Sequence, residues 1–268
     1  MKPAIPILLY HSVSDMPTGD FGPFTVSRKQ FAAHLDRLLA LEFSTLTIGQ
    51  LLTRVRAHLP LPERTAVITV DDGFADFEAN AWPELQERGM TATLYVTAGV
   101  IGGRASWLAP LHADQLPMLG RGQLVELAAQ GCEIGAHSMS HPELDCLPRH
   151  RAAQEIGQCK DILEQALGQS VHSFAYPHGY HDHDVRQMVV DSGYSSASAV
   201  KDELSHVDDD QFALARITVK STFDETRIEQ VLTGEGLAHA KRREKWRTRG
   251  WREVRRWQYR QRRSEVAA

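Results

Sequence analysis

The sequence is poor in the features that mark secreted and membrane-spanning proteins. Its 268 residues contain three cysteines, Cys132, Cys146 and Cys159, without the CxxC spacing of metal or redox motifs. We therefore expect no disulfide framework and a reducing compartment. No apolar run approaches the roughly 18 residues that a spanning helix needs. The apolar stretch near the amino terminus is too short for a signal-peptide core, so a cytoplasmic location is expected.

The charge is distributed unevenly along the chain. Residues 241–263 hold 12 Lys or Arg and 2 Glu, a net +10 against −4 for the whole chain, so the remainder carries −14. A body this acidic argues against nucleic acid as the main ligand. Hydrophobic residues make up 42% and charged residues 24%, as in an ordinary globular protein with a sizeable core.

Strand-like and helix-like segments alternate over the first 240 residues. The predicted strands are 5–9, 66–70, 92–97, 132–136, 171–175 and 194–199. The predicted helices are 27–43, with Ser27 as N-cap, 48–59, 75–89, 122–131, 151–168 and 183–193. This alternation predicts an α/β fold around a largely parallel sheet.

Chemically useful side chains follow several of the predicted strands. His11 follows the first strand, and the pair Asp71 and Asp72, with Gly73 after it, follows the second. The later strand ends supply His137 and His141, and then the segment 176–179. Ligand sites of α/β folds lie at the carboxyl ends of the strands, so we expect these residues to converge.

Two histidines and one carboxylate of this set have the donor chemistry of a divalent metal site. The four-residue spacing of His137 and His141 would place both imidazoles on one side of a helical turn. One of the two aspartates can complete a site with open positions, while the other remains free as a general base. Taken alone, HSMSH also fits a solvated loop, and the Asp-Asp-Gly sequence fits a simple turn about equally well.

Four motifs carry a resemblance to a known family. TVDDG (69–73) resembles the T-F-D-D-G motif of NodB-type polysaccharide deacetylases, and HSMSH (137–141) resembles their H-[ST]-x-x-H motif. FAYPHG (174–179) and LLYHSVSD (8–15) are similar to the F-A-Y-P-[YFH]-G and Y-H-x-[VI]-x-D motifs of one branch. The motifs occur in the family's order, and the resemblance spans residues 5 to about 235.

The resemblance implies a distorted (β/α) barrel and metal-dependent removal of an acetyl group from an N-acetylated sugar. Asp71 would be the general base, and Asp72, His137 and His141 would bind a divalent metal, with Zn²⁺ the favoured ion. The backbone N–H of His178 would stabilise the oxyanion of the tetrahedral intermediate.

Two positions depart from the family pattern. Many members have an Arg that orients the base, where this chain has Ala175, and Arg216 is the candidate substitute. The family's late Leu-x-His, which supplies the general acid, is not evident, and His11 is the candidate replacement. A packing role for His11 is equally compatible with the sequence.

Further candidates for substrate binding surround the third motif. Tyr176, Pro177, His178 and Gly179 are expected to line the cleft by position. Trp107 has an indole that can stack on a sugar ring, although packing of a long loop onto the core is favoured by about two to one.

The chain is expected to divide into a catalytic domain, 1–240, and a basic, Trp-rich tail, 241–268. Trp246, Val254 and Trp257 fall on one helical stripe of the tail that Gly250 interrupts. Such a segment is typical of peripheral contact with an anionic membrane, here the inner face. The alternative is a tail that packs its tryptophans on the acidic body.

Three functions remain open from the sequence. The leading one is deacetylation of an N-acetylated sugar in a polysaccharide, an oligosaccharide or a lipid-linked glycan. The first rival is a metal amidase acting on a non-carbohydrate amide. The second is a non-catalytic sugar-binding protein on a decayed deacetylase scaffold, although binding alone would not need a free carboxylate beside a metal-binding one.

Overall fold

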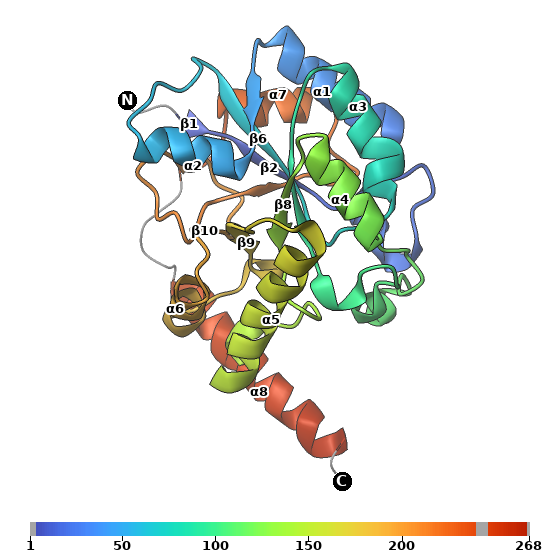
Figure 1. The fold of residues 1–268 in the computed structure, drawn as a ribbon, viewed down its shortest axis with the longest axis vertical. Coiled ribbons are helices and arrows are strands. Elements are labelled where there is room, and N and C mark those ends of the chain that lie inside the picture. The colour runs from blue at the N-terminus through green and yellow to red at the C-terminus, as the bar shows by residue number, and fades with distance from the viewer. Residues whose placement is uncertain (1–3, 240–245, 267–268) are drawn as a thin grey trace.

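A computed structural model describes residues 4–239 and 246–266 of the chain. Its centre is an eight-stranded parallel sheet in the order β10-β9-β8-β7-β6-β2-β12, with β5 also paired to β6 (Figure 1). The strands are β2 (Ile7–Tyr10), β5 (Ser44–Leu46), β6 (Thr65–Val70), β7 (Thr93–Val96), β8 (Glu133–Ala136), β9 (Ser173–Ala175), β10 (Ser196–Ser198) and β12 (Ile217–Thr218). Short strands outside this sheet are β1 (Ala4–Ile5), β3 (Ser12–Val13), β4 (Thr25–Val26) and β11 (Ser205–His206).

The helices α1 to α7 lie around this sheet, whereas α8 extends away from it beyond α5 and α6 (Figure 1). They are α1 (Arg28–Ala40), α2 (Ile48–Arg56), α3 (Trp82–Glu87), α4 (Arg121–Ala129), α5 (Arg149–Leu167), α6 (His183–Asp191), α7 (Glu225–Thr233) and α8 (Trp246–Val266). Two short 3₁₀ turns, η5 (Leu144–Cys146) and η6 (Pro177–Gly179), lie in the loops that concern the site. Ser27 caps α1 as predicted, because its side chain accepts a hydrogen bond from the Gln30 N–H.

The sheet curls into a distorted barrel. The segment 214–218 joins its two ends: Leu214 pairs with Ser198 of β10, and β12 pairs with β2. This closure confirms the predicted fold class. It also carries Arg216, which lies within that segment, into the interior of the barrel, where the side chain is fully buried.

The strands at the centre of the sheet are buried along their whole length. Every residue of β2 and β6 is buried, as expected when a parallel sheet is covered on both faces. Helices contribute apolar faces with helical spacing, for example Phe31, Leu35 and Leu38 of α1. The predicted strands and helices all occur, but the short strands β3, β4, β5, β11 and β12 and the helix α7 were missing from the prediction. The predicted helix 75–89 is a five-residue π-helix, Phe77–Ala81, followed by α3.

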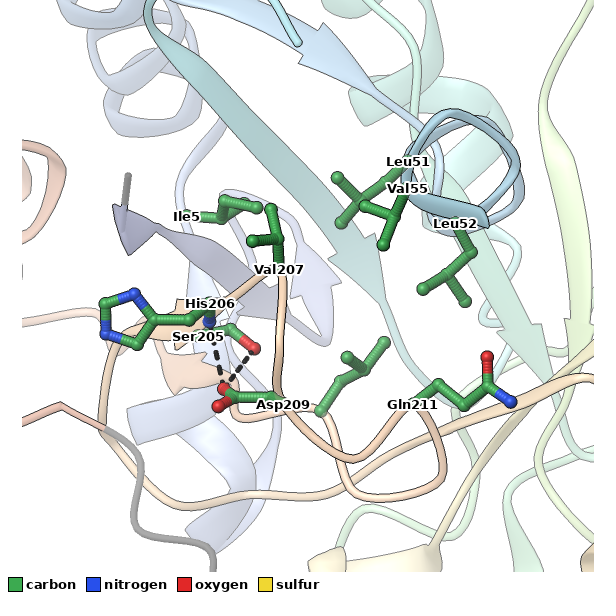
Figure 2. A pocket seen from close by; sticks show the side chains of 10 residues that line it. Ile5, Leu51, Leu52, Val55, Ser205, His206, Val207, Asp209 and Gln211 are labelled. Atoms are coloured by element: carbon green, nitrogen blue, oxygen red, sulfur yellow. Dashed lines mark hydrogen bonds between the residues drawn. The ribbon is translucent and has the colours of Figure 1, made fainter. Parts of the chain in front are cut away.

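A pocket lies near the amino-terminal end of β2 (Figure 2). Apolar side chains of β1 and α2 line it together with residues from the segment after β11. The carboxylate of Asp209 accepts hydrogen bonds from the Ser205 hydroxyl and the His206 N–H, so this polar group is satisfied within the pocket wall. None of the residues that line the pocket follows a strand end with a conspicuous motif, so the pocket is separate from those strand ends.

The basic carboxy-terminal segment forms one helix, α8, which Gly250 does not interrupt. Trp251, Val254 and Trp257 are 49%, 43% and 61% exposed, whereas Arg255 is only 3% exposed. The helix thus packs on the body through Arg255, and Trp251 Nε1 also donates to the Tyr180 hydroxyl at 3.3 Å, as the alternative of a tail packed on the acidic body would have it. Residues 241–245 and the side chain of Trp246 lie outside what the structure describes. Among the helices described, none has the length and apolar character to cross a membrane.

Candidate metal centre

The predicted site residues do converge at the carboxyl ends of neighbouring strands. Asp71 and Asp72 follow β6, His137 follows β8, and the third motif continues from β9. Their side chains meet where β6, β7, β8 and β9 lie next to one another in the sheet. The barrel therefore assembles into one place residues that are far apart in the sequence.

Asp72, His137 and His141 form a compact group of potential metal ligands. Asp72 Oδ1 lies 3.5 Å from His137 Nε2 and 3.3 Å from His141 Nε2. One ligand atom of each residue lies within 4.8 Å of the others. Asp72 and His137 are buried, and the His141 side chain is 9% exposed.

The second motif does not form the helical turn expected from its spacing. Ser138 and His141 instead adopt left-handed backbone conformations, with φ of 64° and 60°. Ser138 Oγ accepts a hydrogen bond from the His141 N–H at 3.0 Å and stabilises this turn. Left-handed non-glycine residues are unfavourable and cluster at functional sites. The two imidazoles meet because of this turn and not because of a helix.

Glu155 of α5 holds the same loop and was missed by the sequence analysis. Its carboxylate accepts hydrogen bonds from the Met139 and Ser140 N–H groups at 2.9 Å and from Ser140 Oγ at 2.7 Å. No sequence signal identifies Glu155, because it lies within an ordinary helical pattern and its partners are known only from the fold.

The two histidines are prepared as neutral ligands. His137 Nδ1 is 2.8 Å from the carbonyl oxygen of Ala175, so Nδ1 carries the proton and donates it, leaving the Nε2 lone pair to face Asp72. Burial lowers the pKa of His137 to about 4. Burial, followed by the neighbouring His137, lowers the pKa of His141 well below its usual range.

Asp72 has a buried carboxyl group that a bound cation would stabilise in its ionised form. Burial, together with the negative charge of Asp71, raises its pKa well above the usual range. Its Oδ1 has no hydrogen-bond partner among the residues that the structure describes. A buried carboxylate oxygen of this kind is costly unless it is paired. Once a bound ion displaces the proton of Asp72, one carboxylate oxygen beside two neutral imidazole nitrogens is a donor set suited to a divalent ion.

Asp71 is held in the opposite electrostatic state by Arg216. The guanidinium donates from Nη1 to Asp71 Oδ1 at 2.6 Å and from Nη2 to Oδ2 at 2.8 Å. Burial alone would raise the pKa of Asp71, but Arg216 and His137 outweigh it, so the pKa lies below the usual value. Arg216 therefore reaches Asp71, as the sequence analysis suggested it could.

His11 and Trp107 border the ligand group. Burial lowers the pKa of His11 to about 4, so its imidazole is neutral near pH 7 and its proposed role as general acid needs protonation during the reaction. Trp107 stacks on His141 with ring centroids 5.1 Å apart and also packs against Phe74. The indole thus packs its loop onto the core and covers a potential ligand; sugar stacking by Trp107 stays a prediction.

The third motif contributes less to the surface than its sequence suggested. Tyr176 is fully buried and its hydroxyl donates to the Phe212 carbonyl oxygen at 2.9 Å, and Pro177 is also buried. Their side chains therefore pack in the barrel wall, and contact of either residue with a substrate stays a prediction. The His178 side chain is exposed, and its backbone is left-handed with φ of 57°. Gly179 has φ of 73°, and an added Cβ would lie 2.6 Å from Val200.

Comparison with known proteins identifies the family of the chain. A family model described as polysaccharide deacetylase matches residues 58–197. YxkH of Bacillus subtilis (strain 168), whose name places it among polysaccharide deacetylases, is 27% identical over 219 residues, which cover 81% of this chain and 72% of YxkH.

Solved structures share the fold at low sequence identity. The Streptococcus pyogenes deacetylase PplD matches with a TM-score of 0.74 and 20% identity, covering 87% of this chain and 99% of PplD. IcaB from Ammonifex degensii matches with a TM-score of 0.73 and 21% identity, covering 85% of this chain and 97% of IcaB. The family model, which covers the segment from before β6 to β10, shows that this chain belongs to the polysaccharide deacetylase family.

Proposed function

We propose that the chain is a metal-dependent hydrolase that removes the acetyl group from an N-acetylated sugar in a polysaccharide, an oligosaccharide or a lipid-linked glycan. The observation that carries the proposal is that the two adjacent carboxylates have different partners. Asp72 lies with two neutral histidines, while Asp71 is ionised against Arg216. A sugar-binding protein would have no use for the second carboxylate.

The residues of the site divide the work of amide hydrolysis. Asp72, His137 and His141 would hold the ion, for which zinc is the favoured candidate from the nitrogen and oxygen donors. A divalent ion there supplies Lewis-acid activation of water and of the amide carbonyl. Asp71 takes the proton from the attacking water, and Arg216 keeps Asp71 ionised and fixes its orientation.

Two further roles complete the proposed mechanism. The peptide N–H of His178 donates to the oxygen on which negative charge develops, which lowers the barrier to the tetrahedral intermediate. His11 would take up the proton that Asp71 has accepted from water and deliver it to the departing sugar amine, so that no proton is gained or lost overall. The cytoplasmic location and the contact of α8 with an anionic membrane both stay predictions, and three arginines of α8 bind the protein itself.

The test of the proposed function is acetate release from a panel of N-acetylated sugars, with non-carbohydrate acetamides as the comparison, alongside metal content measured after dialysis. We expect acetate from the sugars and one bound divalent ion per chain. His141→Ala should lose the ion and the activity together, because two of three ligands rarely suffice. The control, His183→Ala, changes a side chain that is 88% exposed and should alter neither. Stoichiometric metal in a His137→Ala, His141→Ala double variant would exclude this site.

Asp71→Asn tests the general base. The amide keeps the shape of the carboxylate but accepts no proton, so kcat should fall by roughly 10²–10⁴, with metal content retained. Asp210→Asn is the matched control, because Asp210 pairs with Arg186 in the same two-bond manner at the surface. Near-normal kcat in Asp71→Asn would place the base on another residue.

Arg216→Met tests how the base is kept ionised. Without the guanidinium, burial acts on Asp71 with less opposition and its pKa rises, so the carboxylate protonates sooner as the pH falls. The acidic limb of the pH–rate profile should therefore move to higher pH. Arg186→Met serves as the control for loss of a paired arginine. An acidic limb that stays in place in a folded Arg216→Met protein would remove Arg216 from the mechanism.

A further inference from the structure

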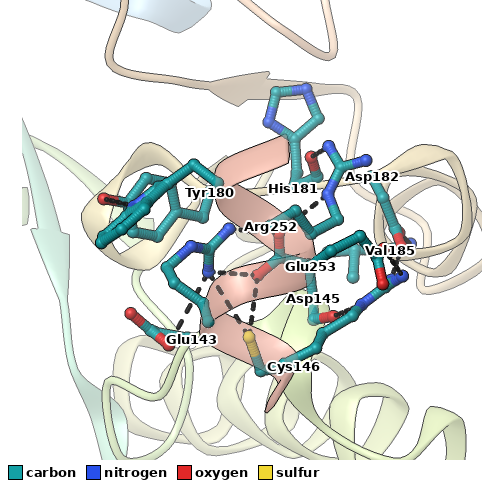
Figure 3. Close-up of polar contacts among 12 residues, drawn as sticks. Glu143, Asp145, Cys146, Tyr180, His181, Asp182, Val185, Arg252 and Glu253 are labelled. Carbon is teal, nitrogen blue, oxygen red and sulfur yellow. Dashed lines mark hydrogen bonds and ion pairs between the residues drawn. The ribbon is translucent and has the colours of Figure 1, made fainter. Parts of the chain in front are cut away.

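The helix α8 binds two loops of the catalytic body with its arginine side chains (Figure 3). One loop contains η5 and the other is 180–182, directly after η6. Three arginines spaced within two turns, Arg252, Arg255 and Arg256, make these contacts. The basic segment is therefore attached to the body by specific charged hydrogen bonds.

Asp145 is the centre of the first set of contacts. Arg255 donates from Nη1 to Oδ1 at 2.8 Å and from Nη2 to Oδ2 at 2.7 Å, and Arg252 Nε donates to Oδ2 at 3.1 Å. The backbone oxygen of Asp145 accepts from Arg256 Nε at 2.9 Å. Asp145 and Arg255 are 4% and 3% exposed. Two-bond arginine–carboxylate pairs fix geometry as well as charge.

The same arginines bind the second loop. The Arg255 guanidinium lies 3.7 Å from the centre of the Tyr180 ring, within the range of a cation–π contact. Arg252 Nη2 donates to the His181 carbonyl oxygen at 2.9 Å. Arg256 Nη2 donates to Asp182 Oδ2 at 2.7 Å. Each arginine therefore contacts both loops.

Both loops continue directly from the residues of the site. Asp145 lies four residues after His141, and Tyr180 lies two residues after His178. The rings of His141 and His178 are 4.6 Å apart, so the two motifs meet where the loops begin. A helix that joins Asp145 to Tyr180 consequently sets the spacing between the ligand loop and the loop carrying the proposed oxyanion donor.

We propose that Arg255 is a positioning residue of the active site, and that α8 acts as a clamp holding the His178 loop in register with the ligand loop. This inference rests on the proposed function for the role of His178. It assigns to the basic tail a part in catalysis on small substrates as well as large ones. Deleting the tail should then impair the catalytic centre itself.

Loss of the charge pair and loss of the clamp can be separated by mutation. Arg255→Met alone leaves the buried carboxylate of Asp145 with less compensation, which destabilises the fold. A second change, Asp145→Asn, removes that uncompensated charge but does not restore the contacts with Tyr180. Arg255→Lys retains the positive charge but cannot make the two-bond contact. Comparing the three variants separates three effects of losing Arg255: the loss of its positive charge, the lower stability of the fold and the loss of the two-bond contact.

The experiment measures kcat/KM on a small soluble N-acetylated sugar, metal content and amide hydrogen exchange of segment 177–182 in the full chain. For Arg255→Lys and for the double variant Arg255→Met, Asp145→Asn, we expect full metal content, about 10- to 100-fold lower kcat/KM, mainly in kcat, and faster exchange at the Gly179 and Tyr180 amides. Trp257→Ala, a change on the exposed side of α8, should leave all three measurements unchanged.

Two results would overturn the inference. One is kcat/KM within twofold of the wild type in the metal-loaded Arg255→Lys protein. The other is unchanged exchange in segment 177–182 when the two-bond contact is lost. Metal content and hydrogen exchange do not depend on the identity of the substrate. If the wild type releases no acetate, the proposed function fails, while the exchange measurement still decides whether α8 holds the loop.

Discussion

The ion pair between Arg216 and Asp71 is the interaction on which the rest of the site depends. Two adjacent carboxylates in a buried position repel each other, and burial would protonate both. The guanidinium keeps one of them ionised and occupies both of its oxygens from one side. The neighbouring Asp72 is left with a buried oxygen, Oδ1, that has no hydrogen-bond partner among the described residues. A bound cation would satisfy this oxygen. Closure of the barrel through 214–218 is what delivers the guanidinium to this point.

The parts of the site that sequence could predict are those that follow from strand ends. Parallel strands bring their carboxyl ends together, so the positions of Asp71, Asp72 and His137 were foreseeable once the strands were recognised. Arg216 was identifiable as a candidate because the family's usual arginine is missing at Ala175 and a guanidinium from a neighbouring strand could reach Asp71. That Arg216 lies next to a strand could only be suggested from the sequence, because β12 is two residues long and has no clear sequence pattern.

Other features depend on tertiary contacts that leave no local signal. The second motif makes a left-handed turn because Ser138 and Glu155 hold it, although its spacing also fits a helix. Tyr176 was expected in the cleft, but its ring is buried and its hydroxyl is used by a backbone carbonyl. The charge run of the tail suggested a solvated or membrane-bound helix. Burial of Arg255 on Asp145 could be found only from the fold, because charge patterns do not specify their partners.

The most direct test of this account is a crystal structure of the full chain with zinc, with anomalous data collected at the zinc absorption edge. We expect one anomalous peak at about 2.0–2.2 Å from an Asp72 oxygen and the Nε2 atoms of His137 and His141. Asp71 should remain outside the coordination sphere and paired with Arg216. A peak at another place, or Asp71 bound to the ion with Arg216 turned away, would contradict the division of roles between the two carboxylates.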